Sequence, residues 1–182
     1  FIAVLTYFYK DIFNLIKNKD LLIKIFISSI PVIIIGFILV ETNLIDSVRN
    51  IKVVGWMTLI FGIILYLSDK FNLDKEIGSN FNLKSAIIIG IFQTLSLVPG
   101  VSRSGITITA ARLLRFKRFD AAKISFLISI PTLGAVSIFG LKNLISNNNE
   151  VFSILNISAI SFSFIFFLIK INYFLNYIKT FS

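Results

Sequence analysis

The 182-residue sequence contains no cysteine and no histidine. Without cysteine, disulfide bonds and thiol catalysis are excluded, and the redox compartment stays undetermined. Without histidine, the chain lacks the commonest general base and metal ligand of proteins. Charged residues are scarce as well, at 15% of the chain, and only nine of them are acidic. The sequence therefore predicts no metal site built from its own residues.

Apolar residues are abundant instead. They make up 56% of the chain, including 20 phenylalanines, and the mean hydropathy is +0.89. Runs long enough for a membrane helix of about 20 residues recur. We therefore predict an all-α integral membrane protein, a polytopic helix bundle forming a single transmembrane domain over residues 1–182. The net charge of +9 is attributed to membrane topology, and no nucleic-acid partner is expected.

Five apolar stretches are predicted as membrane spans or remnants of spans. They are Phe1–Tyr9, Leu21–Val40, Val53–Leu67, Ala121–Leu141 and Val151 to about Leu168. Pro31 and Pro131 fall inside two of them, where neighbouring helices can satisfy the freed carbonyl, and kinks are expected there. The chain opens with phenylalanine inside an apolar run, so we expect it to be part of a longer protein.

The segment from about residue 85 to 115 does not fit a full span. Its first 13 residues would form a helix of about 20 Å, and its last 10 a helix of about 15 Å. Neither crosses a hydrocarbon core of roughly 30 Å, and Pro99 and Gly100 separate them. We predict a re-entrant helical hairpin, whose irregular tip must be buried in protein or line a wet cavity.

The distribution of basic residues tests this topology. If the hairpin enters and leaves on one side, that side carries 13 basic residues in its loops and tail, and the opposite side carries three. Positive residues favour the cytoplasmic side of a bacterial membrane. The count therefore assigns the hairpin ends to the cytoplasm and disfavours a single span through this segment.

Arg103 lies at the predicted tip, with no acidic residue within 15 positions on either side. An arginine at membrane depth costs a few kcal/mol, so it is usually functional or paired. The alternative to a functional role is a buried ion pair, but every acidic residue lies in a loop or at a helix boundary. Arg103 is thus predicted to meet an anionic ligand or a carboxylate from elsewhere.

The neighbours of Arg103 indicate phosphate as that anion. Gly100 and Gly105 allow close backbone approach. Ser102, Ser104 and Thr107 carry hydroxyl groups, and the helix that starts after the tip presents free N–H groups and its positive dipole end. Arginine adds a planar fork that matches phosphate oxygens in pairs. Together these residues predict an anion-binding site.

Other polar residues carry weaker signals. Gln93 lies on the incoming helix and is a candidate phosphate ligand, although a hydrogen bond to a neighbouring helix explains it equally well. Ser125 and Ser129 are expected to bond backbone or neighbouring helices. The basic run over 112–118 resembles a lipid-phosphate site, but a cytoplasmic flank of basic residues is the simpler interpretation.

The segment GIFQTLSLVPGVSRSGITITAARLLRF, followed by AAKISFLISIPTLGA, resembles the second signature region of bacterial undecaprenyl-diphosphate phosphatases, the bacitracin-resistance family. The resemblance covers nearly the whole chain, and Pro-Gly-x-Ser-Arg-Ser-Gly is its most specific part. It implies a multi-pass protein of the bacterial cell membrane that hydrolyses undecaprenyl diphosphate to recycle the cell-wall lipid carrier. It also implies that Arg103, Ser102, Ser104 and Thr107 hold the diphosphate, with membrane lipids and a possible second copy of the chain as partners.

The family has an earlier signature with glutamates, serines and a histidine, and nothing in this chain matches it. The resemblance therefore implies that the nucleophile or base, and the ligands of a divalent cation (Mg²⁺ or Ca²⁺), are absent here, so that the 182 residues alone are expected to be inactive. Two other hypotheses stay open: a transporter of anionic lipid or small anions that uses the same site, and a structural membrane subunit.

Overall fold

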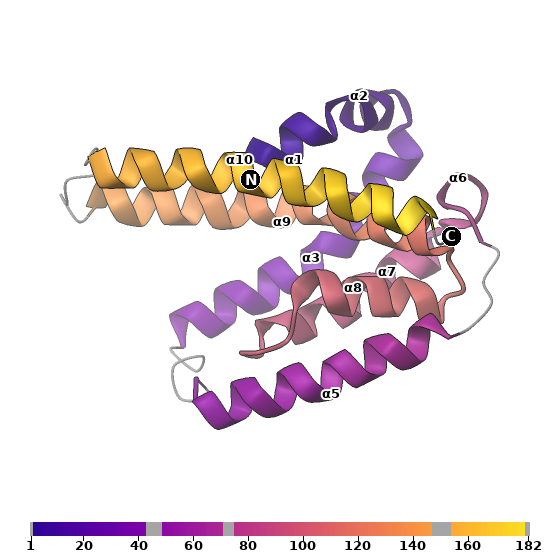
Figure 1. Cartoon of the computed structure of the whole chain (residues 1–182), viewed down its shortest axis with the longest axis horizontal. Helices are drawn as coiled ribbons and strands as arrows, with labels where there is room; N and C mark the ends of the chain where they lie inside the picture. Colours follow the sequence, from indigo (N-terminus) through magenta and orange to yellow (C-terminus); the bar gives the residue numbers. More distant parts are fainter. Residues whose placement is uncertain (1, 43–48, 71–74, 147–153, 181–182) are drawn as a thin grey trace.

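A computed structural model describes residues 2–42, 49–70, 75–146 and 154–180, and nearly all of them are helical. The α-helices are α1 (Ile2–Tyr7), α2 (Tyr9–Lys17), α3 (Lys19–Glu41), α5 (Ile51–Asp69), α6 (Ile77–Asn80), α7 (Leu83–Thr94), α8 (Arg103–Leu113), α9 (Arg118–Ser146) and α10 (Ile154–Thr180). A short 3₁₀ turn, η1 (Leu95–Leu97), continues α7. The predicted all-α fold is confirmed (Figure 1).

Four helices are long and apolar enough to cross a membrane: α3, α5, the first part of α9 and most of α10. Their outer faces carry many exposed isoleucine, leucine and phenylalanine side chains, as a lipid-facing surface requires. Four of the five predicted stretches are thus confirmed as spans, with Pro31 inside α3 and Pro131 inside α9. The remnant predicted over Phe1–Tyr9 has no span-length helix in its described part. The last prediction ended too early, because α10 continues to Thr180 rather than stopping near Leu168.

Between α5 and α9 the chain forms the predicted hairpin. Helix α7 and η1 lead to a non-helical tip at Val98–Ser102, and α8 returns from it. Figure 1 shows the hairpin running back along α5, with both of its ends at the end of the bundle that holds α6. The breakers Pro99 and Gly100 fall in the tip, as the sequence indicated.

The hairpin is packed into the bundle rather than exposed to lipid on all sides. Helix α7 crosses α3 so closely that a Cβ atom on Gly90 would lie 2.5 Å from the carbonyl oxygen of Ser28. Below this crossing, Ile89, Phe116 and Ile128 belong to one buried cluster that joins α7, the turn after α8, and α9. Small residues at such crossings let backbones approach and gain van der Waals contact, the main source of helix association in a membrane.

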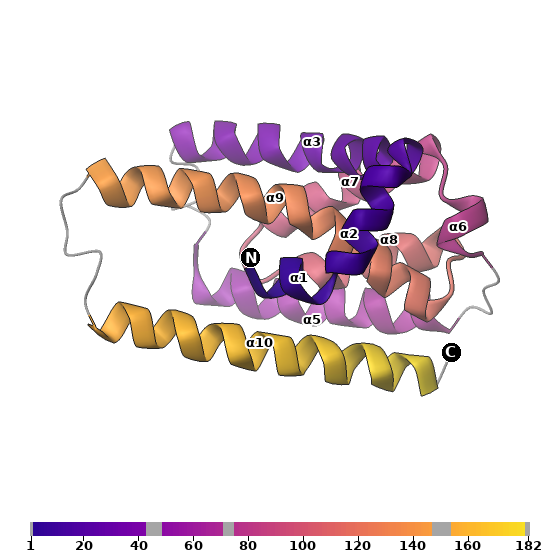
Figure 2. The ribbon, with the colours of Figure 1, turned by 90° about the horizontal axis from the view of Figure 1, so that it is seen from above.

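A second buried cluster attaches α10 to the remainder of the bundle. Ile171 and Leu175 of α10 pack with Val4 and Phe8 near the start of the chain and with Leu127 of α9. Figure 2 shows α10 as the outermost helix on one side, with α1 at its inner face. The bundle therefore has a tight half built around the hairpin and a looser half held by α1 and α10.

Candidate anion site at the hairpin tip

The tip of the hairpin is fixed against α5. Gly100 has φ +96°, a conformation that favours glycine, and a Cβ atom there would lie 2.5 Å from the carbonyl oxygen of Val54. The hydroxyl of Thr58 donates a hydrogen bond of 3.0 Å to the carbonyl oxygen of Gly100. Val54 is one turn from the start of α5 at Ile51, so the tip lies near the end of α5 opposite to the hairpin's own ends.

Ser102 and Ser104 both lie on the exposed side of the tip. Ser102 is the N-cap of α8, and its Oγ accepts a 3.2 Å hydrogen bond from the N–H of Gly105. The Oγ atoms of Ser102 and Ser104 are 3.4 Å apart. The cap orients the first turn of α8, and the N–H groups of residues 103 and 104 have no hydrogen-bond partner in the described part of the chain. This first turn is the helix terminus that the sequence predicted for an anion.

Arg103 is the first residue of α8 and is half-buried. Its Nη2 atom is buried and makes no hydrogen bond within the described residues. The ion pairs seen among the described residues each join a carboxylate to a cation other than Arg103. The carboxylates are Asp11, Asp20, Asp69 and Glu76. A buried guanidinium nitrogen without a partner is costly, so its place at the tip calls for an anionic partner that the described residues do not supply.

Thr107 lies one turn further along α8 and is 2% exposed. Its hydroxyl donates to the carbonyl oxygen of Arg103 at 3.0 Å and lies 2.6 Å from the hydroxyl of Ser125 on α9. The predicted helix-bonding role of Ser125 is thus confirmed, and so is that of Ser129, which donates to the carbonyl of Phe126. In this conformation the Thr107 hydroxyl joins α8 to α9 instead of facing the exposed side of the tip with the serines.

Gln93 lies in the last turn of α7 and is fully buried, with 0% exposure. Neither its Oε1 nor its Nε2 has a hydrogen-bond partner in the described residues. The hydrogen bond to a neighbouring helix, one of the two sequence-based explanations, is therefore not formed here. Buried amides are nearly always satisfied, so the hairpin holds a second polar group that lacks a partner.

The tip residues do not fit a divalent cation. Mg²⁺ and Ca²⁺ prefer carboxylate and carbonyl oxygens, whereas the tip presents a guanidinium, hydroxyls and amide N–H groups. Over the residues that the structure describes, no three acidic side chains come together as a metal-binding group. The chemistry of the tip is that of an anion site.

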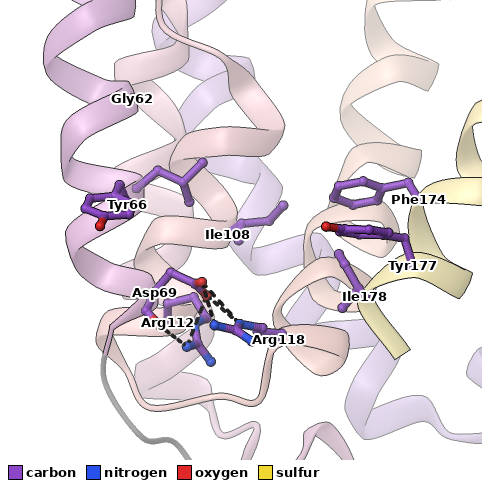
Figure 3. Close-up of a pocket in the computed structure, with 10 residues that line it drawn as sticks. Gly62, Tyr66, Asp69, Ile108, Arg112, Arg118, Phe174, Tyr177 and Ile178 are labelled. Atoms are coloured by element: carbon purple, nitrogen blue, oxygen red, sulfur yellow. Dashed lines mark hydrogen bonds and ion pairs between the residues drawn. The ribbon is translucent and has the colours of Figure 1, made fainter. Parts of the chain in front are cut away.

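Sequence analysis missed a second polar cluster, at the other end of α8. Arg112 and Arg118 converge there on Asp69, the last residue of α5 (Figure 3). The guanidinium of Arg112 also donates to the backbone carbonyls of Asp69 at 2.8 Å and Phe116 at 3.1 Å. The two arginines lie more than 40 positions after Asp69 in the chain, so no local sequence pattern could have predicted that they pair with it.

Comparison with known proteins identifies relatives of this chain. The family model of the bacitracin resistance protein BacA matches residues 1–182. The chain belongs to the BacA family. The resemblance drawn from Pro-Gly-x-Ser-Arg-Ser-Gly is thereby confirmed, and so is a multi-pass bacterial membrane protein, since four span-length helices agree with this membrane family.

Curated relatives of this BacA chain carry the name undecaprenyl-diphosphatase. A relative from Pelagibacter ubique (strain HTCC1062) is 48% identical over the whole chain, which covers 71% of that relative. One from Saccharophagus degradans is 37% identical over 97% of the chain and 71% of its own length. One from Jannaschia sp. is 39% identical over 75% of the chain, which is 56% of its length. The chain thus spans about half to seven-tenths of the relatives it matches.

Proposed function

We propose that the protein is a membrane phosphatase that hydrolyses undecaprenyl diphosphate to undecaprenyl phosphate and so recycles the lipid carrier of cell-wall synthesis. The BacA family and the shared name of the relatives support this activity. The observation that carries it in this chain is the buried, unpartnered Nη2 of Arg103 beside two exposed serine hydroxyls at a helix N-terminus.

These groups match the charge of a diphosphate. Arg103 would bind two oxygens of the terminal phosphoryl group through its planar fork, and the hydroxyls of Ser102 and Ser104 with the N–H groups of the first turn would donate to others. In the reaction, water attacks the terminal phosphorus, the P–O bond to the bridging oxygen breaks, and undecaprenyl phosphate leaves with inorganic phosphate as the second product. Fixed donors that stabilise the spreading negative charge lower the barrier to such a transfer.

The serines act as donors in this proposal. A serine nucleophile needs an adjacent base to take its proton. The described hydrogen-bond partners of the Ser102 and Ser104 hydroxyls are each other and the N–H of Gly105, none of which is a base. The histidine and divalent cation that the family resemblance implies remain predictions, and chelation by EDTA of the purified intact protein tests the cation.

We infer that the diphosphate reaches the tip from the outer side of the membrane. The tip packs beside Val54 and Thr58, near the end of α5 that the charge distribution assigns to the outside. Ser102 and Ser104 are exposed at this level, while Thr107 beneath them is closed off by α9. A lipid carrier in the outer leaflet would present its headgroup at this depth.

A transporter could use the same groups, because broken helices also bind anions in transporters. The comparisons give no support to it, since the relatives share the name of a hydrolase. The predicted second copy of the chain is a separate proposal, which cross-linking in native membranes tests.

Replacement of Arg103 tests the proposed function. In the intact protein, Arg103→Ala should lower phosphate release from undecaprenyl diphosphate about 10²–10³-fold, the effect of removing one transition-state donor. Arg103→Lys keeps the charge but loses the fork, and should retain intermediate activity. Unchanged phosphate release in Arg103→Ala would overturn the proposal. A loss of folding without loss of turnover in the remaining folded protein would indicate a structural subunit instead.

A further inference from the structure

A cavity of about 530 Å³ lies between α5 and α10, at the end of α8 away from Arg103. Figure 3 shows its two sides: Gly62, Tyr66 and Asp69 on one, and Phe174, Tyr177 and Ile178 on the other. These two walls belong to helices that are held apart, because α10 attaches to the bundle through α1 and α9. The cavity is thus a gap between two membrane helices.

Among the described residues, the polar end of the cavity holds more positive than negative charge. Asp69 receives an ion pair of 3.1 Å from Arg112 and one of 2.8 Å from Arg118, so two guanidinium groups share one carboxylate. Lys70, which follows Asp69 in the chain, has its Nζ 4.8 Å from the ring centre of Tyr66, a residue that lines the cavity. The Arg112 side chain is 5% exposed, whereas that of Arg118 is 40% exposed and is the cation that an incoming anion can reach.

The other end of the cavity is apolar. Leu65 of α5, Ile108 of α8 and Phe174 of α10 line it. Gly62 adds no side chain to this wall, and a Cβ atom there would meet nothing within 4 Å. The space beside it is therefore open.

The depth of the cavity in the membrane agrees with its having one polar and one apolar end. Asp69 ends the apolar span of α5, Arg118 begins that of α9, and Ile178 ends that of α10. The charge distribution assigns this end to the cytoplasm. The cations thus lie at headgroup depth and the apolar wall lies below them, at acyl-chain depth, where basic pockets between membrane helices bind acidic lipids.

We propose that this cavity binds an acidic phospholipid of the cytoplasmic leaflet, with its phosphate beside Arg118 and one acyl chain along Gly62 and Ile108. Charge complementarity selects this occupant, because a zwitterionic headgroup would bring a second positive charge toward two guanidinium groups. The lipid would fill the gap and tie α10 to α5. The proposal does not rest on phosphatase activity, since Arg103 is at the opposite end of α8.

Lys117 supplies a matched control for Arg118. It is the adjacent cation in sequence, its side chain is 41% exposed, and it pairs with Glu76 at 2.5 Å rather than with Asp69. A side-chain hydrogen bond and the charge of Lys117 hold the pKa of Glu76 below its usual value, so this pair is ionised at neutral pH. Lys117 does not line the cavity. Arg118→Gln and Lys117→Gln therefore remove the same charge, at the cavity and beside it.

Gly55 supplies the control for Gly62. Both glycines lie on α5, both are exposed, and neither would bring a Cβ atom within 4 Å of another group. Only Gly62 lines the cavity. Gly62→Leu should occupy the acyl-chain wall, whereas Gly55→Leu should add an equal apolar surface elsewhere on the same helix.

Native mass spectrometry of the intact protein, offered equal amounts of phosphatidylglycerol and phosphatidylethanolamine with the same acyl chains, tests the proposal. Wild type should retain phosphatidylglycerol in preference, and Arg118→Gln should reduce its retention about fivefold, the effect of one cation near the surface. Lys117→Gln should keep the preference. Gly62→Leu should reduce retention of both lipids, and Gly55→Leu should not.

Three results would overturn the proposal. One is equal retention of both lipids by wild type, and another is an equal loss in Arg118→Gln and Lys117→Gln. The third is displacement of the lipid by millimolar inorganic phosphate, which would make this a site for a small anion. If Arg118→Gln does not fold, Arg118→Lys should keep the preference, and the glycine pair still tests the acyl-chain wall without touching the ion pair.

Discussion

The hydroxyl oxygens of Thr107 and Ser125 lie 2.6 Å apart in the interior and join the re-entrant hairpin to α9. Neither side chain is more than 4% exposed. The contact explains how a short helix such as α8, which cannot span the membrane, keeps a fixed position: a hydroxyl pair and the Ser102 cap hold the two ends of its first turns. The position of Arg103 depends on this attachment.

Removing the Thr107 hydroxyl should therefore affect stability first. Thr107→Val leaves the buried hydroxyl of Ser125 without its partner and should lower the free energy of unfolding by about 1 kcal/mol, the usual worth of such bonds between membrane helices. Ser125→Ala leaves Thr107 bonded to the carbonyl of Arg103 and should cost less. Thermal unfolding in detergent measures both.

A double variant separates this role from phosphate binding. If the two hydroxyls bond each other, Thr107→Val with Ser125→Ala should be less destabilised than the sum of the single variants. If Thr107 instead contacts the diphosphate, Thr107→Val should reduce turnover by the same factor whether or not Ser125 is present, with no change in the unfolding temperature.

Gly100 should not tolerate a side chain. Gly100→Ala combines a φ of +96° with a Cβ atom 2.5 Å from the backbone of α5, and backbone cannot yield as a flexible side chain can. The tip should separate from Val54, and phosphate release should fall at least tenfold. Gly55 lies on α5 next to Val54, and a Cβ atom there would meet nothing within 4 Å, so Gly55→Ala should keep activity and thermal stability. Full activity in Gly100→Ala would show that docking of the tip on α5 is dispensable.

Gln93 is predicted to trade stability for function. Gln93→Leu replaces a fully buried amide with no partners by an apolar side chain of similar size. It should raise the unfolding temperature, because an unsatisfied buried amide costs about 1–3 kcal/mol. If the amide meets the diphosphate, phosphate release should fall in the same variant. Lower stability would mean that Gln93 has a protein partner in the intact molecule.

The Asp69 carboxylate should be the most sensitive group of the cluster that it forms with Arg112 and Arg118. Asp69→Asn removes the carboxylate that pairs with the buried Arg112, although the bonds of Arg112 to two backbone carbonyls remain. The loss should be about 1–3 kcal/mol of unfolding free energy, below the value for a fully buried pair because Asp69 is partly exposed. Lys117→Gln, which breaks only an exposed pair, should change the unfolding temperature little.

The topology can be tested with single cysteines, since the chain has none of its own. Thr42 and Ser79 are exposed at opposite ends of the bundle, and Ser104 is exposed at the tip. A membrane-impermeant maleimide added outside intact cells should label Thr42→Cys and Ser104→Cys, and should label Ser79→Cys only after permeabilisation. The reverse pattern for Thr42 and Ser79 would invert the assigned orientation.

The sequence by itself determined the membrane class, the positions of the spans, the broken hairpin and the isolation of Arg103. Each of these follows from properties local in the chain: apolar length, a Pro-Gly break, and the absence of any carboxylate near residue 103. Even the confirmed family was read from one continuous segment around the tip.

Only the tertiary structure decided which groups meet. The Thr107 hydroxyl contacts that of Ser125, and the tip packs against Val54. Asp69 forms ion pairs with two arginines that lie more than 40 positions away in the chain. The reason is physical: a membrane helix gains little from any one apolar neighbour over lipid, so its partners are chosen by close backbone approach and polar contacts, which depend on packing that hydropathy does not encode.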